Sequence, residues 1–137
     1  MASILRVDTL TDASSNNSVA TSFVASGSDK FWANVVADGT SVSDSFNQGS
    51  FTDSGTGIGV CNFTSNMGNV NYVNKMGSTL YDYSAGNSVR LSQVTVQATG
   101  SCNIDSFYET ASSEVAYEDR PKLVAIAGDL AWVKHLI

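Results

Sequence analysis

Alternation of apolar and polar residues is the clearest pattern in this chain, and it predicts β-strands. Between residues 90 and 98, Val94, Val96 and Ala98 occupy every second position, and the positions between them carry Gln or Thr. A period of two is typical of a strand with one buried face, so these three side chains are expected to point the same way. Cys102 and Ile104 alternate with polar neighbours in the same manner, which predicts another strand over residues 102–109.

A hairpin is predicted earlier in the chain. Residues 31–36 and 42–47 have strand character, and Asp38 and Gly39 between them suit a tight turn. Alternate residues of the second strand, Val42, Asp44 and Phe46, are expected on one face, with serines on the other.

Several further short segments are predicted to be strands. They cover residues 49–54, 57–64, 69–76, 122–127 and 130–137. The first two are expected to pair across Gly55 and Thr56, whose backbone tolerates a tight turn. The segment 122–127 is an almost continuous apolar run, as expected of a strand covered on both faces. Residues 110–121 contain helix formers without a sustained apolar face, which predicts a loop or one helical turn.

About eight short strands with almost no helix favour an all-β fold. We expect an antiparallel β-sandwich, or a jelly-roll-like variant of it, as a single domain over residues 25–137. Residues 1–24 are expected to form an extended N-terminal arm or a first edge strand. As an assembly arm, this segment would pair with a neighbouring subunit through Ile4, Leu5, Val7 and Leu10. A small sheet protein has edges to hide, and symmetric association, for example as a homotrimer, hides them.

Charge and composition exclude several classes of function. The 13 acidic residues outnumber seven basic ones, the net charge is −6, and no basic stripe is available to neutralise nucleic acid. No apolar run approaches the length of a membrane span, and the N-terminus has no targeting signal, so neither membrane insertion nor secretion is expected.

The residues capable of chemistry are few and scattered. His135 is the single histidine and has no second ligand near it in sequence, so no metal, cofactor or catalytic residue is expected. Asp38, Asp44 and Asp53 lie at turns and strand ends, where carboxylates usually serve the turn itself and not a glycosidase reaction. The chain is therefore expected not to be an enzyme.

Two cysteines occur in different predicted strands. Cys61 and Cys102 are expected to be buried, reduced thiols, and a disulfide between neighbouring strands stays open because their Cα separation is unknown.

The aromatic residues offer one candidate contact surface. Trp32 lies in an alternating strand and is expected in the core, whereas Tyr81 and Tyr83 lie in a polar loop and are the candidate receptor contacts. Aromatic faces also suit sugar rings, which keeps a carbohydrate-binding module as an alternative.

Two segments resemble known structural proteins. Between Lys30 and Thr64, a Lys-x-Trp strand, an Asp-Ser-Phe-Asn strand, a Thr-Asp-x-Gly-Thr-Gly turn and an Asn-Phe-Thr strand follow one another. Their order and spacing resemble a module of virion structural proteins of tailed bacteriophages, especially marine ones. The phrase Leu-Arg-Val-Asp-Thr-Leu, starting at Leu5, is similar to the opening of phage tail and fibre proteins.

The resemblance covers roughly half of the chain, and it implies a function. It implies a non-enzymatic virion component made in the host cytoplasm, most simply a tail fibre or appendage protein that binds copies of itself and other virion proteins and touches a host surface glycan. A capsid decoration or head-fibre protein is the first alternative, and a carbohydrate-binding module is the second.

Overall fold

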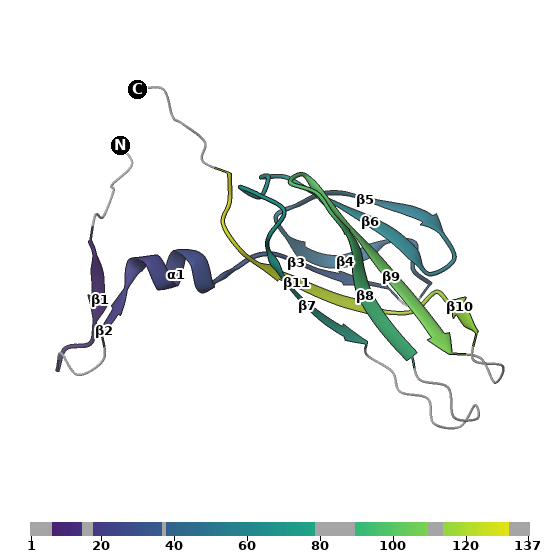
Figure 1. Ribbon diagram of the computed structural model, residues 1–137, viewed down its shortest axis with the longest axis horizontal. Coiled ribbons are helices and arrows are strands. Elements are labelled where there is room, and N and C mark those ends of the chain that lie inside the picture. The colour runs from purple at the N-terminus through teal and green to yellow at the C-terminus, as the bar shows by residue number, and fades with distance from the viewer. Residues whose placement is uncertain (1–6, 15–17, 37, 79–89, 110–113, 132–137) are drawn as a thin grey trace.

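Two antiparallel sheets packed face to face form the body of the protein (Figure 1). The computed structural model describes residues 7–14, 18–36, 38–78, 90–109 and 114–131. One sheet has the strand order β4-β3-β11-β7; in the other, the order is β10-β9-β6-β5, and β8 also pairs with β9. The predicted all-β, antiparallel sandwich is thereby confirmed.

The strands of the first sheet are β3 (Asp29–Val35), β4 (Val42–Phe46), β7 (Val73–Ser78) and β11 (Lys122–Ala127). The strands of the second sheet are β5 (Gln48–Gly55), β6 (Ile58–Phe63), β8 (Arg90–Gln97), β9 (Ser101–Glu109) and β10 (Val115–Tyr117). An N-terminal hairpin, β1 (Thr9–Thr11) and β2 (Ser18–Ala20), precedes the helix α1 (Thr21–Gly27).

The core lies between the two sheets and consists of their inward-facing apolar residues. Its members are Phe31, Ala33, Val35, Cys61, Phe63, Met67, Tyr72, Cys102, Ile104, Val124 and Ile126. Aromatic rings link the layers, because Phe31 of β3 and Phe63 of β6 have ring centroids 4.9 Å apart. Burial of these side chains is the main source of stability for a fold with so little helix.

The predicted hairpin turns are confirmed. β3 pairs with β4, and Gly39 between them has a φ of 71°. β5 pairs with β6, and Gly55 and Gly57 at their turn have φ values of 126° and 72°. Such positive φ values favour glycine, because other side chains clash with their own backbone there.

Asn47 carries the chain from the first sheet to the second. It joins β4 to β5 and has a φ of 60°, which asparagine tolerates better than most residues. Its side-chain amide donates to the carbonyl oxygen of Lys30 at 2.9 Å, and its Oδ1 accepts from the Ser65 amide at 2.7 Å. Hydrogen bonds to Lys30 and Ser65 therefore fix the backbone where the chain passes from one sheet to the other.

A β-bulge in β4 overturns the predicted face of that strand. Asn34 is opposite Asp44, but the next residue, Val35, is opposite Val42, so one residue of β4 is left without a partner. Beyond the bulge the faces exchange: Val42 packs against the core, whereas Phe46 is 52% exposed. The prediction that these residues share one face is wrong for this reason.

A second bulge has the same effect in β8. Val94 is opposite Ile104 and packs against the core, whereas Val96 is opposite Asn103 and is 52% exposed. The predicted common face of Val94 and Val96 is therefore wrong.

Three predicted elements differ from the structure. β11 buries Lys122, Val124 and Ile126 but exposes Leu123, so it is covered on one face and not on both. Residues 115–117 form a strand in place of a loop or helical turn, because β10 pairs with the stretch of β9 beyond the end of β6. The strand predicted over 69–76 begins at Val73.

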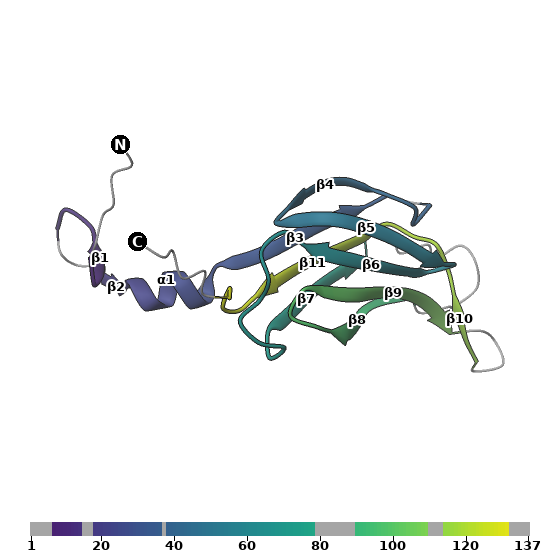
Figure 2. The ribbon, with the colours of Figure 1, turned by 90° about the horizontal axis from the view of Figure 1, so that it is seen from above.

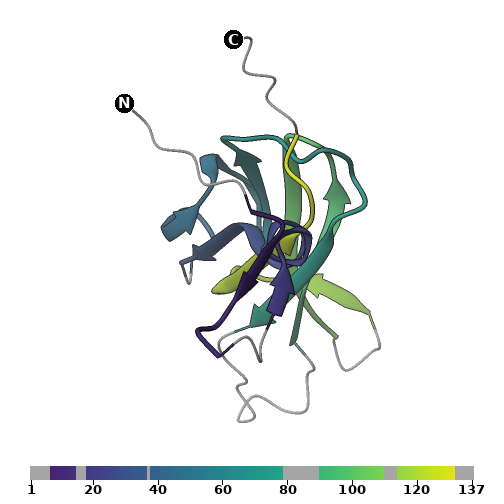
Figure 3. The ribbon, with the colours of Figure 1, turned by 90° about the vertical axis from the view of Figure 1, so that its left-hand side faces the viewer.

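The N-terminal segment leaves the sandwich. β1 and β2 pair with each other in a two-stranded sheet of their own, and α1 connects them to β3 (Figure 2). Seen along the long axis, the hairpin lies in front of the sandwich and joins neither sheet (Figure 3). We call residues 7–14 and 18–28, which contain β1, β2 and α1, the arm.

Candidate functional site

The arm is a small folded unit held by backbone pairing and one threonine. Thr9 is opposite Ala20 and Thr11 is opposite Ser18 in the hairpin. The Thr21 amide donates to the carbonyl oxygen of Asp8 at 2.9 Å, which ties the start of α1 to β1. The arm therefore has a defined shape of its own.

Apolar side chains of the arm are exposed. Phe23 on α1 is 74% exposed, the largest value among the large apolar residues that the structure describes. The other exposed apolar residues of the arm are Val7, Leu10, Val19 and Val24. Isolated two-stranded hairpins and helices of seven residues are marginal in water. An arm built of both, with its apolar side chains uncovered, is expected to need an outside surface.

The predicted assembly residues are only partly described. Val7 and Leu10 lie in the arm and are exposed, which fits their predicted use; Ile4 and Leu5 lie outside the described residues. Phe23 and Val24 were not singled out from the sequence. The available signal was two adjacent large apolar residues within a stretch rich in Ser, Asn and Gly.

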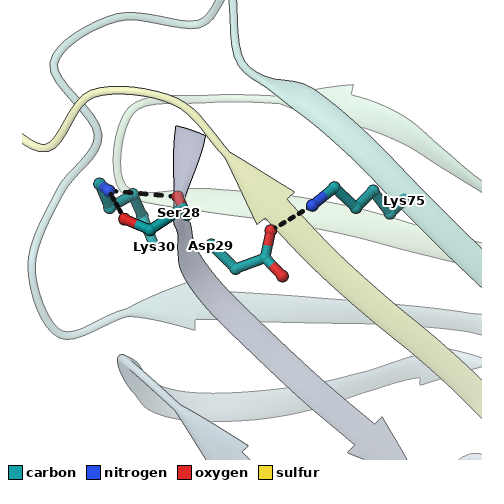
Figure 4. A network of polar contacts seen from close by, with 4 residues as sticks. All are labelled: Ser28, Asp29, Lys30 and Lys75. Carbon is teal, nitrogen blue, oxygen red and sulfur yellow. Dashed lines mark hydrogen bonds and ion pairs between the residues drawn. The ribbon is translucent and has the colours of Figure 1, made fainter. Parts of the chain in front are cut away.

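Polar contacts set the junction between the arm and the sandwich (Figure 4). Asp29, the first residue of β3, forms a 2.6 Å ion pair with Lys75 of β7. Lys30 donates from Nζ to the carbonyl oxygen of Ser28 at 3.1 Å and also contacts its hydroxyl group. Exposed ion pairs contribute little stability, so these contacts chiefly orient the chain as it leaves α1.

The outer face of the first sheet exposes large apolar side chains. Trp32 of β3 is 37% exposed and lies opposite Phe46 of β4, and Leu123 of β11 is 39% exposed. Trp32 was predicted in the core, and that prediction is wrong. Phe31, Ala33 and Val35 point inward, so the alternation of β3 turns Trp32 outward.

A hollow of about 490 Å³ opens on this face. Trp32 and Leu123 contribute its large apolar side chains, and Asn34 and Lys75 contribute polar groups. Gly77 leaves space beside Leu123, because a Cβ added there would lie 3.7 Å from the Leu123 Cβ. We call this site the Trp32 hollow. Its size falls in the range of sites that hold a side chain or a small ligand.

A buried lysine lies at the opposite end of β11 from the arm. Lys122 is fully buried, and its Nζ donates to the carbonyl oxygen of Gly57 at 3.1 Å. The Asp119 carboxylate accepts from the Gly57 amide at 2.6 Å. Burial lowers the pKa of Lys122, against the opposing effect of nearby carboxylates, of which Asp119 is the strongest. These contacts tie the β5–β6 turn to the segment before β11, which is a structural role.

Asp105 is a buried carboxylate near Lys122. Its side chain is 5% exposed, and its Oδ1 has no hydrogen-bond partner in the described part of the chain.

The two cysteines are direct neighbours across β6 and β9. Cys61 is opposite Cys102, both are fully buried, and both are free thiols. Their burial was predicted. A hydrogen bond with Cys61, together with burial, raises the pKa of the Cys102 thiol, which keeps it protonated and unreactive.

The three aspartates considered as catalytic candidates each accept a hydrogen bond from a backbone amide one or two residues further along the chain. Asp38 accepts from the Thr40 amide at 3.1 Å, and this bond lowers its pKa. Asp44 accepts from the Ser45 amide, and Asp53 from the Gly55 amide. Tyr81, Tyr83 and His135 lie outside the described residues.

Neither a metal cluster nor a membrane helix is found in what the structure describes. Among the residues with a described position, no three His, Cys, Asp or Glu side chains are grouped to hold a metal ion. In the same part of the chain, α1 is too short to cross a bilayer.

Comparison with known proteins gave no relatives. No protein-family model, no curated protein and no solved structure matches this chain.

Proposed function

We propose that this chain is a non-enzymatic structural component of a bacteriophage virion, a tail fibre or appendage protein that assembles as a homo-oligomer. One observation carries the proposal: the arm presents Phe23 and other apolar side chains that its own sandwich does not cover. In a structural protein, neighbouring copies cover the exposed apolar side chains of such an arm. A homotrimer is the assembly we propose, with other virion proteins as further partners.

The resemblance to phage virion modules agrees with the position of its segments in the fold. The stretch from Lys30 to Thr64 forms β3, β4, β5 and β6. β3 pairs with β4 in the first sheet and β5 pairs with β6 in the second, and Asn47 joins the two pairs. The second resembling segment contains Val7 and Leu10 of the arm. The first segment therefore lies in the sandwich and supplies two strands to each sheet, and the second lies in the arm.

Purified particles test this function directly. We expect mass spectrometry of virions from the phage that encodes the chain to detect it in the particle, and gold-labelled antibodies to locate it on the tail. Label on the head would favour the alternative of a capsid decoration or head-fibre protein. Absence from particles that contain the other structural proteins would overturn the proposal.

The Trp32 hollow favours a second candidate function, a carbohydrate-binding module. An exposed indole next to Asn34 and Lys75 offers one flat apolar face and polar groups at its rim, an arrangement that suits a sugar ring. In a virion protein, the ligand would be a glycan of the host surface. We expect Trp32→Ala to abolish any glycan binding, whereas Phe46→Ala, which removes an exposed aromatic outside the hollow, should keep it. Titration of both variants on a glycan array decides this point.

A further inference from the structure

We infer that Trp132, the residue after the last one that the structure describes, packs its side chain into a hollow between α1 and the sandwich of its own copy. The proposal goes beyond the proposed function, because the contact lies within one copy and does not require that copies associate. The hollow has a volume of about 630 Å³, and Ala25 of α1, Lys30 of β3, Asn69 and Leu130 are among the residues that line it. We call it the junction hollow.

The described part of the chain ends at this hollow. After β11, the chain runs beside the loop that precedes β7, and the Ala131 amide donates to the carbonyl oxygen of Asn66 at 2.8 Å. Ala131 itself lines the junction hollow. Adjacent Cα atoms are about 3.8 Å apart, so Trp132 is covalently held at the edge of the hollow. Any other occupant would first have to be brought there.

Strand parity directs the Trp132 side chain toward the hollow. Leu130 forms an antiparallel bridge with Met67 and lines the hollow. The Gly68 amide donates to the carbonyl oxygen of Asp129 at 2.7 Å, so the backbone on either side of Leu130 is paired with this loop. In an extended chain, side chains two residues apart point to the same side. Continuation of the pairing therefore places Trp132 on the side of Leu130.

The lining of the junction hollow suits an indole ring. Ala25 and Leu130 offer apolar contacts, and Asn69 and Asp129 offer polar groups. A buried tryptophan usually finds an acceptor for its ring N–H, so a site with both apolar and polar walls fits it. The exposed Asp129 provides such an acceptor at the rim. The volume lies in the range of sites that enclose a small ligand, which gives the ring enough room.

A tryptophan in this hollow covers one side of α1 and leaves the proposed assembly side free. Ala25 and Phe23 are two positions apart, which is about 200° around a helix with 3.6 residues per turn. Because Ala25 lines the hollow, Phe23 lies on the far side of α1 and stays exposed. Figure 2 shows α1 between the hairpin and the sandwich. The contact therefore fixes the direction in which the arm leaves the body, and it supports a helix of seven residues that is marginal alone.

Fluorescence of a protein with a single tryptophan tests this contact. The chain has two tryptophans, and Trp32→Phe leaves Trp132 as the only one. In this full-length variant, we expect emission at shorter wavelength and weaker quenching by acrylamide than in guanidinium chloride, because the hollow shields the ring from water. Native emission and quenching equal to those of the unfolded chain would overturn the inference.

Two further substitutions in the Trp32→Phe background locate the ring. Ala25→Glu places a charged side chain in the junction hollow and should return Trp132 to the emission and quenching of an exposed indole. Ser22→Glu adds the same charge to α1 outside the hollow and should keep the shift. Thermal unfolding followed by circular dichroism should show that the sandwich is folded in both variants. A shift that Ala25→Glu leaves unchanged would show that Trp132 is shielded elsewhere, and the proposed site would be wrong.

The double variant Trp32→Phe and Phe23→Asp separates this contact from assembly. Phe23→Asp is expected to dissociate the copies, and light scattering on the same sample measures whether it does. The shift of Trp132 should persist in the monomer, because the ring packs in its own copy. Loss of the shift on dissociation would place the ring against another copy, which overturns the inference and leaves assembly intact. A wild-type monomer in which Trp132 is shielded would overturn the proposed assembly and support the inference.

Discussion

Cys61 and Cys102 face each other directly across β6 and β9, and both are fully buried free thiols. The pair lies in the centre of the core, where the thiols pack as small apolar groups. Their hydrogen bond stabilises the protonated form of Cys102.

We expect these thiols to be unreactive in the folded protein. Ellman's reagent should label neither cysteine in native buffer and both after unfolding in guanidinium chloride without a reductant, because burial excludes the reagent from both thiols. At Cys102 the raised pKa also suppresses the thiolate. Fewer than two thiols after unfolding would mean that the pair is oxidised to a disulfide.

Gly57 is the glycine that the fold can least replace. An added Cβ would lie 2.5 Å from the Ser106 carbonyl oxygen and 2.7 Å from the Glu118 amide nitrogen, at a φ of 72°. We expect Gly57→Ala to lower the free energy of unfolding by about 3 kcal/mol or more, since conformational strain and overpacking add. Gly55→Ala is the control, because Gly55 also has a positive φ but no atom within 4 Å of the added Cβ. A loss for Gly57→Ala of about 1 kcal/mol or less in urea denaturation, as expected from a positive φ alone, would refute the role of the clash.

Tyr72 makes stability depend on pH in the alkaline range. Burial raises its pKa from 10.0 to about 12. Its hydroxyl group lies 3.1 Å from the carbonyl oxygens of Ala98 and Ser101 and is the donor. The unfolded chain ionises first, so the stability contributed by Tyr72 is present below pH 10.0 and is lost as the pH rises to about 12.

Tyr72→Phe should remove this dependence. We expect the variant to be less stable by about 1 kcal/mol at neutral pH, because the hydrogen bond is gone. Its unfolding free energy should fall less steeply than that of the wild type across the interval from pH 10.0 to about 12. Chemical denaturation at several pH values measures both effects, and parallel curves would contradict the assignment.

Lys122 has the opposite effect on the pH dependence. Its pKa is lowered from 10.5 in the folded state, so the unfolded chain holds more protons in the window below 10.5. In that window, stability rises with pH. We expect the unfolding free energy of the wild type to rise relative to that of Lys122→Met as the pH approaches 10.5. A constant difference between the two proteins over this range would show that burial does not disfavour the charged amine.

Most of the strands could be predicted from the sequence, because alternation of apolar and polar residues within a short segment indicates a strand with one buried face. The β5–β6 hairpin is an example, since Gly55 and Gly57 mark its turn. The bulges could not be predicted, because the residue left without a partner depends on pairing with a distant strand, as at Val42 and Val35. Lys122 was included in an apolar run, although its position two residues before the inward-facing Val124 implied burial.

The candidate site was harder to predict than the fold. Val7 and Leu10 were expected to belong to an extended N-terminal arm, whereas Phe23 belongs to a short helix that no sustained apolar pattern marks. Trp32 was expected in the core because it lies in an alternating strand, although Phe31 and Val35 on the same strand already occupied the inward positions. Strand parity was the better guide, because it places each side chain relative to its neighbours.

The molar mass of the purified chain in solution tests the central claim, assembly through the arm, most directly. By size-exclusion chromatography with light scattering, we expect a stable oligomer, three times the 14.4 kDa chain for the proposed trimer. Phe23→Asp should shift it to a folded monomer, whereas Ser22→Asp, which adds the same charge at the neighbouring position of α1, should not. A wild-type protein that runs as a 14.4 kDa monomer at micromolar concentration, or an oligomer that Phe23→Asp leaves unchanged, would contradict the account.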